Sequence, residues 1–221
     1  MGFGKIFSSA WNEFGSNFKA IFSLVFLVFV IKLIISHFMV PYSDEIRNSV
    51  FTFNNISMVL LALIIFIILS VFINSAIYGM SINKVKYGFR DLLKSARQSF
   101  WKFLGRSILL MLIMVLLFIL LVVPGIIFMI YWIFAMFIWF NEPKVGFMNS
   151  LRSSKKLVEG RWWLTLGYTL LIFLIVFVIQ AIFAYVPYLN SLVSLLSGVF
   201  LIYFMRYMYI SYSSRTSNKK K

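Results

Sequence analysis

The chain has 221 residues, of which 62% are hydrophobic and 12% are charged, and its formal net charge is +15. That apolar fraction exceeds the roughly half expected of a soluble domain and favours an integral membrane protein. The absence of cysteine excludes disulfides, thiolate metal sites and a cysteine nucleophile. Nucleic-acid binding is the weaker interpretation of the basic charge, because most of the surface that would carry it must face lipid.

The segment 1–19 predicts an amphipathic helix. Its aromatic residues recur at helical spacing, at Phe3, Phe7, Trp11, Phe14 and Phe18, while Glu13 lies off that stripe. The pattern is typical of an interfacial helix whose aromatic face enters the acyl boundary of a bilayer. Packing of the aromatic stripe on the protein itself is the alternative.

Two apolar runs follow and predict the first pair of spans. The first runs from about residue 20 to Val40 and is expected to end at Pro41, and the second runs from about Ile56 to Ile82. Lys32 lies inside the first span, where it indicates either a site for an anionic head group or ion, or a side chain that snorkels to the outer face. Asn74 in the second span indicates interhelical hydrogen bonding.

The segment 83–106 is the most basic part of the chain and predicts a separate amphipathic helix on the membrane surface. Apolar runs at 107–123 and 126–140 then predict the third and fourth spans. Pro124 and Gly125 lie between them and predict a tight turn, because proline fixes φ and glycine accepts positive φ.

A third surface helix is predicted at 147–158, after the helix-stopping sequence Asn141-Glu142-Pro143. The fifth and sixth spans are expected at about 163–184 and 192–210. Gln180 in the fifth span, like Asn74 in the second, indicates interhelical hydrogen bonding. Residues 1–210 therefore form one membrane domain. The basic tail 211–221 is expected to be disordered.

The distribution of basic residues predicts the orientation. With six spans, 19 of the 21 lysines and arginines fall on one side, and the exceptions are Lys32 and Arg47. The positive-inside rule makes that side cytoplasmic. We expect a multi-pass protein of the cell membrane with both termini in the cytoplasm.

The three surface helices also indicate an internal repeat, with units near 1–82, 83–140 and 141–210. Serine-containing stretches at Ser9, Ser95 and Ser154 precede the three span pairs at similar distances. A threefold repeat is one interpretation, since membrane proteins often contain repeats. The other is that any surface helix ahead of a span has this composition.

One stretch resembles a known membrane family. It comprises Val123-Pro124-Gly125-Ile126, Asn141-Glu142-Pro143, Ser150-Leu151-Arg152-Ser153-Ser154 and Glu159-Gly160-Arg161-Trp162-Trp163. This pattern is similar to the polytopic domain that is fused to some glycerophosphodiester phosphodiesterases and to related stand-alone prokaryotic proteins. The resemblance implies a membrane architecture; it does not imply hydrolysis, because no residues remain for the soluble phosphodiesterase domain.

The sequence offers no set of residues for catalysis. One histidine and six scattered acidic residues do not make a metal cluster, and no phosphate-binding loop or serine elbow occurs. We therefore expect a non-enzyme without cofactors. Its basic residues would contact anionic lipid, and it would organise or remodel the bilayer or assist lipid handling. The candidate lipid-binding residues are Arg90, Lys94, Arg97, Lys102, Arg106, Lys155, Lys156 and Arg161.

Two alternatives stay open. Lys32, Asn74 and the Pro124-Gly125 break favour a small transporter or channel. An exposed complementary helix face would instead indicate a membrane subunit, either in a homo-oligomer or beside a partner membrane protein.

Overall fold

The computed structural model describes residues 2–47, 53–79, 86–120, 122–142 and 145–218, and within those ranges the chain is helical with short connections and no strand. The helices are α1 (Phe3–Ser16), α2 (Phe18–Arg47), α3 (Phe53–Tyr78), α4 (Phe89–Leu120), α5 (Val122–Tyr131), α6 (Ala135–Asn141), α7 (Phe147–Val158), α8 (Trp162–Phe183) and α9 (Pro187–Asn218).

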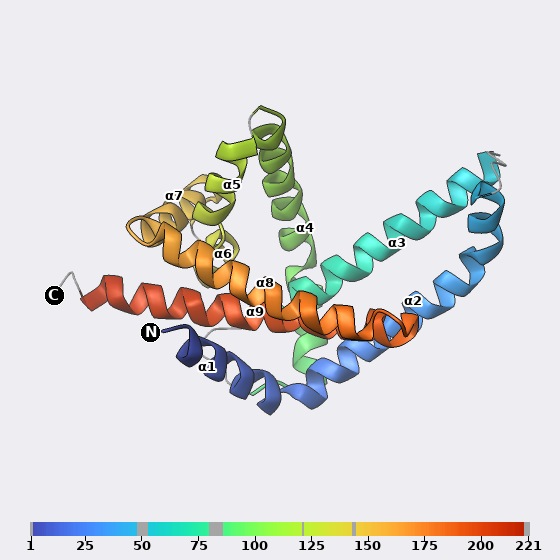
Figure 1. Cartoon of the computed structure of the whole chain (residues 1–221), viewed down its shortest axis with the longest axis horizontal. Coiled ribbons are helices and arrows are strands. Elements are labelled where there is room, and N and C mark those ends of the chain that lie inside the picture. Colours follow the sequence, from blue (N-terminus) through green and yellow to red (C-terminus); the bar gives the residue numbers. More distant parts are fainter. Residues whose placement is uncertain (1, 48–52, 80–85, 121, 143–144, 219–221) are drawn as a thin grey trace.

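Within the described ranges, six stretches are long and apolar enough to cross a membrane, which confirms an all-α membrane protein with six candidate spans. These stretches are Phe18–Met39, Ile56–Tyr78, Phe89–Ile119, Val122–Asn141, Trp162–Phe183 and Tyr188–Ser214. In Figure 1 they form three hairpins, namely α2 with α3, α4 with α5 and α6, and α8 with α9.

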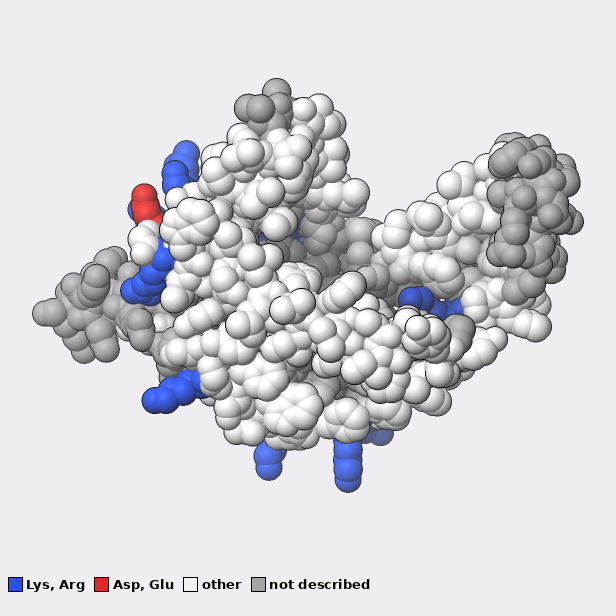
Figure 2. All heavy atoms as spheres, in the orientation of Figure 1, with Lys and Arg blue, Asp and Glu red and all other residues white. Residues whose placement is uncertain are grey.

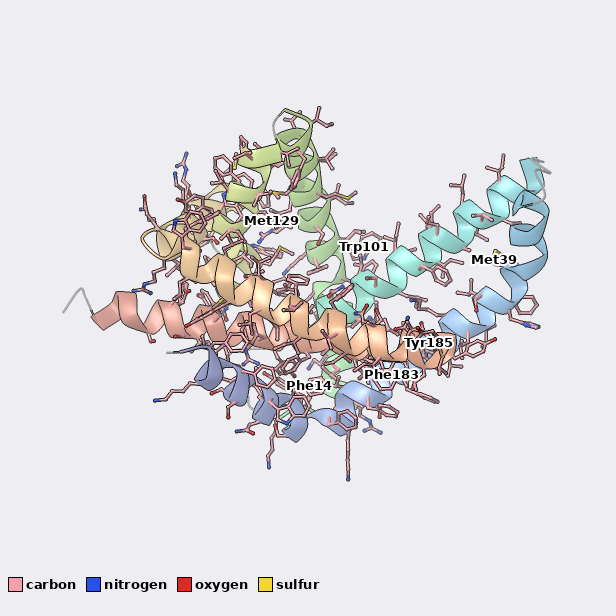
Figure 3. All side chains as sticks on the ribbon, in the orientation of Figure 1. Phe14, Met39, Trp101, Met129, Phe183 and Tyr185 are labelled. Carbon is pink, nitrogen blue, oxygen red and sulfur yellow. The ribbon has the colours of Figure 1, made fainter. Side chains whose placement is uncertain are left out.

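The three hairpins diverge from a common base. In Figure 1 both termini lie at the left, while the tip of α2 and α3 points to the upper right, that of α4 and α5 to the top, and that of α8 and α9 to the right. Tyr185, labelled in Figure 3, stands at the tip of the α8–α9 hairpin with 93% of its surface exposed. The two termini therefore lie on one side of this view, and the three tips point away from them in different directions.

The hydrophobic core lies at this base. The inner ends of α2, α3 and α4 pack against α1 and the second half of α9. Its largest fully buried side chains include Tyr203, Phe204 and Met208 of α9 and Phe134, which precedes α6. Beyond the base, α3, α4 and α8 expose rows of large apolar side chains. Such faces suit contact with lipid, as expected of membrane spans.

Helix α1 packs on α9, which favours the second interpretation of its aromatic stripe. Phe14 (Figure 3) stacks edge-on against Phe200 and Tyr203 of α9, with ring centroids 5.6 and 6.0 Å apart. The rings of Phe3 and Phe204 are tilted against each other, with their centroids 5.3 Å apart. Only the outer part of the stripe, with Trp11 57% exposed, remains free to meet lipid.

Two helices run further than the sequence predicts. Helix α2 continues through Pro41 to Arg47, so the expected helix end at that proline is wrong. Proline removes one backbone donor, and membrane helices tolerate this where neighbouring groups satisfy the freed carbonyl. Helix α9 continues to Asn218, so residues 211–218 of the expected disordered tail are helical. Residues 219–221 lie outside the described ranges.

The basic segment does not form a helix of its own. Residues 89–106 are the first half of α4 and continue without interruption into the third span. No proline lies between Phe89 and Leu120, and Gly105 by itself costs too little to end a helix. The basic amphipathic segment is therefore a rigid extension of a span rather than a surface helix free to reorient.

The predicted turn at Pro124-Gly125 is also misplaced. Both residues lie in α5, which begins at Val122, whereas α4 ends at Leu120, so neither residue stands between the two helices. Proline fits the first turn of a helix, where its missing N–H would have no partner. Gly125 serves close packing instead, because a Cβ there would come within 2.8 Å of the Phe118 ring of α4.

The fourth span is broken rather than continuous. Between α5 and α6 the backbone makes a turn at 132–134. Ser154 of α7 is fully buried beside this break, where its hydroxyl donates to the Tyr131 carbonyl over 2.7 Å and accepts from the Phe134 N–H over 3.1 Å. Because those backbone groups would otherwise lack partners in an apolar setting, Ser154 holds the break in place.

Candidate functional site

A polar pocket lies where the end of α3, the basic half of α4 and α6 meet. Its volume is about 350 Å³, and its lining comprises Gly79, Gln98, Ser99, Lys102, Arg106, Trp139 and Phe140. Three polar residues of α4, Gln98, Lys102 and Arg106, lie one helical turn apart along one face, and Ser99 is next to Gln98. The pocket thus gathers two of the predicted lipid-binding residues, Lys102 and Arg106.

Small residues bring α3 and α4 together beside this pocket. A Cβ on Gly79 would lie 2.4 Å from the Ser99 Oγ and 2.5 Å from the Ser95 Oγ. The Ser95 hydroxyl donates to the Ala76 carbonyl over 2.9 Å, across the helix pair. This close approach fixes where the polar face of α4 sits relative to the end of α3.

Two buried donors in the pocket lack acceptors. Within the described part of the chain, neither Nη1 of Arg106 nor Nε1 of Trp139 has a hydrogen-bond partner. The Arg106 guanidinium lies over the indole ring of Trp139, which contributes a cation–π contact. Of the described residues that line the pocket, Lys102 and Arg106 carry positive charge and none is a carboxylate.

The other predicted residues of α4 lie apart from this pocket. Arg90, Lys94 and Arg97 are exposed along its first half. Arg97 also borders a second pocket of about 460 Å³, at the point where α3 and α4 separate. That pocket includes Trp101, which Figure 3 places between the two helices and which is 77% exposed.

The predicted residues after the fourth span form a second basic group. Lys155 and Lys156 are exposed on α7, and the Lys155 Nζ lies 5.7 Å from the centre of the Tyr131 ring. Arg161 connects α7 to α8, with its guanidinium 5.2 Å from the Tyr212 ring. These contacts place aromatic rings beneath cations at the base of the molecule.

The intramembrane polar residues lie on three different helices. Lys32 of α2 is half-buried, with its Nζ 5.5 Å from the Phe66 ring of α3. The Asn74 amide donates to the Ser70 carbonyl over 2.8 Å within α3, rather than across a helix pair as the sequence predicts. Gln180 is half-buried on α8.

A buried ion pair that sequence reasoning missed joins the two ends of the chain. The Arg206 guanidinium of α9 donates to the Glu13 carboxylate of α1, with Nη1 and Oε1 2.5 Å apart. The side chains are only 9% and 4% exposed. Arg206 therefore does not snorkel, as its position near a span end suggests, but pairs with an acid in the core.

Asn17 and Tyr87 extend this buried cluster. The Asn17 amide donates to the Glu13 carbonyl over 2.9 Å, and its Oδ1 accepts from the Tyr87 N–H over 2.7 Å. Burial raises the pKa of the Tyr87 hydroxyl, with a smaller opposing effect from the Arg206 charge. The cluster ties the α3–α4 connection to both α1 and α9.

A spacing signal in the sequence marks this cluster. Ile6, Ala10, Glu13 and Asn17 follow one another at intervals of four, three and four residues, and all are buried. That interval defines one helix face, adjacent to the more conspicuous aromatic stripe. An acid on such a face, in a chain whose last span carries one arginine, indicates a buried pair.

Among the residues that the structure describes, no group of three or more His, Asp or Glu side chains gathers at a site suited to a metal. Comparisons of the chain with protein-family models, with curated proteins and with solved structures find no match. The functional interpretation therefore rests on the geometry of this molecule.

Proposed function

We propose that this chain is a non-enzymatic protein of the cell membrane. It binds anionic lipid through the lysines and arginines at the base of the molecule, and it organises or remodels the bilayer or assists lipid handling. Both termini and α7 face the cytoplasm in this proposal. We also propose that the chain is related to the polytopic membrane family associated with glycerophosphodiester phosphodiesterases. The protein would associate with further copies of itself or with a partner membrane protein.

The observation that carries the proposal is the separation of charged and apolar parts. Most lysines and arginines lie at the base of the molecule, and the outer parts of the three hairpins, called the arms below, are apolar. The sequence has no lysine or arginine between Ser107 and Glu142 or between Trp162 and Met205. Figure 2 shows the Lys and Arg side chains of this face mainly along the edge that carries α1 and α7, whereas the outer parts of the hairpins are largely uncharged. Apolar arms in the hydrocarbon would hold the base at the level of the lipid head groups.

The exposed residues of α4 provide the test. Each basic residue near an anionic membrane surface contributes about 1 kcal/mol. Replacing Arg90, Lys94 and Arg97 together with glutamine should therefore lower affinity for anionic lipid by up to about 3 kcal/mol, on the order of a hundredfold. Native mass spectrometry of the purified protein counts the anionic lipids that remain bound.

A matched control removes charge elsewhere. Lys32 and Arg47 are the two basic residues that the sequence predicts away from this side. Their replacement with glutamine should leave the bound anionic lipid unchanged. Equal lipid counts for the wild type and the α4 variant would contradict the proposed function.

A further inference from the structure

We propose that the pocket between α3, α4 and α6 binds one phosphate group, either that of an anionic phospholipid or free inorganic phosphate. The inference that the phosphate belongs to a lipid rests on the proposed function. The inference that the pocket binds phosphate is independent of that function. The residues that would hold the phosphate are Arg106, Lys102 and Trp139, with Gln98 and Ser99 beside them.

The chemistry of the lining selects an oxyanion. Lys102 and Arg106 supply two positive charges, and Gln98 and Ser99 supply further donors. A phosphate offers three or more acceptor oxygens and pairs well with the planar fork of a guanidinium. Among the described residues that line the pocket there is no carboxylate to neutralise these charges.

Two unpartnered donors mark where the ligand belongs. The Trp139 side chain is only 6% exposed, yet its Nε1–H has no acceptor among the described residues, and the same holds for Nη1 of Arg106. Buried donors are nearly always hydrogen-bonded in folded proteins. Two such groups in one pocket of about 350 Å³, a size typical of ligand sites, indicate an acceptor that the protein itself does not supply.

The position of the pocket along α4 suits a lipid phosphate. Gln98 and Lys102 are exposed and Arg106 is half-buried, so the pocket opens beside Gln98 and Lys102. Arg106 lies eight residues, or about 12 Å, further along α4 than Gln98. Directly after Arg106 begins the uncharged stretch 107–119. The pocket thus lies at the border between head groups and hydrocarbon, and the exposed Leu109, one helical turn after Arg106, offers a path for an acyl chain.

The test compares the full chain with pocket variants in two arms. In the lipid arm, protein in nanodiscs of phosphatidylcholine containing some phosphatidylglycerol is washed at high salt, extracted into a neutral detergent and analysed by native mass spectrometry. The wild type should retain one phosphatidylglycerol. R106Q combined with K102Q should lose it, with at least a tenfold lower affinity. In the second arm, delipidated protein is titrated with inorganic phosphate and binding is followed by ³¹P NMR.

Two further variants keep the result interpretable. Trp139→Phe keeps a ring beneath Arg106 but removes the indole N–H, so it should weaken binding severalfold even if the double variant does not fold. K32Q with R47Q removes the same charge from residues that the sequence predicts away from the base, and it should not change the retained phosphate. Phosphate bound in the second arm alone would support the pocket with free phosphate as its source.

Two outcomes would overturn the inference: equal binding by the wild type and both pocket variants, or equal loss in the K32Q/R47Q control. Failure of the proposed function appears separately, as salt-labile lipid whose amount does not change when the exposed Arg90, Lys94 and Arg97 of α4 are replaced.

Discussion

At the scale of residues, the Glu13–Arg206 pair shows how this chain handles charge away from water. An isolated buried charge costs several kcal/mol, so each member stabilises the fold only because the other is present. The pair joins the first helix to the last, and Asn17 carries the connection on to the backbone of Tyr87. Loss of one charge should therefore disturb the whole base rather than α1 alone.

The ion pair predicts strong non-additivity. Glu13→Ala should lower the free energy of unfolding by about 3–5 kcal/mol, because it leaves Arg206 buried without its anion. Combining it with Arg206→Met should restore much of that loss, since an apolar side chain of similar length tolerates burial. Denaturant titration of the four proteins in detergent measures the coupling, with the exposed Glu159→Ala as control. Purely additive losses would show that the two residues do not act as a pair.

The Tyr87 hydroxyl predicts a loss of stability at alkaline pH. Its pKa is raised in the folded protein, mainly by burial, so the folded state holds the phenol proton more tightly than the unfolded state does. The stabilisation is present below the ordinary tyrosine pKa of about 10 and is lost as pH rises through the raised value. The stability advantage of the wild type over Tyr87→Phe should therefore stay constant up to about pH 9 and shrink as the pH rises above about 10. An advantage that grew with pH would contradict the assignment.

At the scale of elements, composition and periodicity predict which segments are helices but locate their ends less well. The spans near 56–82, 163–184 and 192–210 follow from apolar length, and α3, α8 and α9 occupy them. Pro41 and Pro124 mislead, because a proline can stand in the first turn of a helix or within a span as well as at a helix end. The break between α5 and α6 depends on Ser154 from α7, a contact between distant segments that local pattern does not reveal.

The candidate site divides in the same way. Basic residues that flank a span are visible in the sequence, so Lys102 and Arg106 could be predicted. Their meeting with Trp139 could not, because it follows from how close α3 and α4 approach and from how the break orients α6.

Alanine at Gly79, directly after α3, and alanine at Gly105 in α4 should have opposite effects on stability. Gly79→Ala places a Cβ 2.4 Å from the Ser99 Oγ and should destabilise the α3–α4 pair by about 1–3 kcal/mol. Gly105→Ala is the matched change inside α4, where a Cβ meets nothing within 4 Å, and should stabilise the protein by about 0.5–1 kcal/mol. Thermal unfolding in detergent compares the two. A stabilising Gly79→Ala would show that α3 and α4 are not held at the close separation described.

At the scale of the whole molecule, the arms and the base perform different tasks. The arms expose apolar residues along most of their length, so their stability in a membrane comes from helices that satisfy their own backbone and from contact with lipid. The base holds the shared core, the buried ion pair and the polar pocket. Changes in the base should therefore affect all three hairpins, whereas conservative apolar changes on an arm should remain local.

This division predicts a single orientation in the membrane. Both termini lie together at the left in Figure 1, and 19 of the 21 basic residues fall on the side that the sequence assigns to the termini. Lysine and arginine are retained on the cytoplasmic side during insertion, so the base should face the cytoplasm and the tips the exterior.

Because the chain has no cysteine, single cysteines can report on this orientation directly. Cysteines at Lys94 and Lys155 should react with a membrane-impermeant maleimide only after the cells are opened. Cysteines at Asp44 and Asn190 should react in intact cells. Each variant must retain wild-type expression, and total labelling in detergent controls for burial. Labelling at position 94 in intact cells would invert the orientation and place the basic base, and with it the polar pocket, against the outer leaflet.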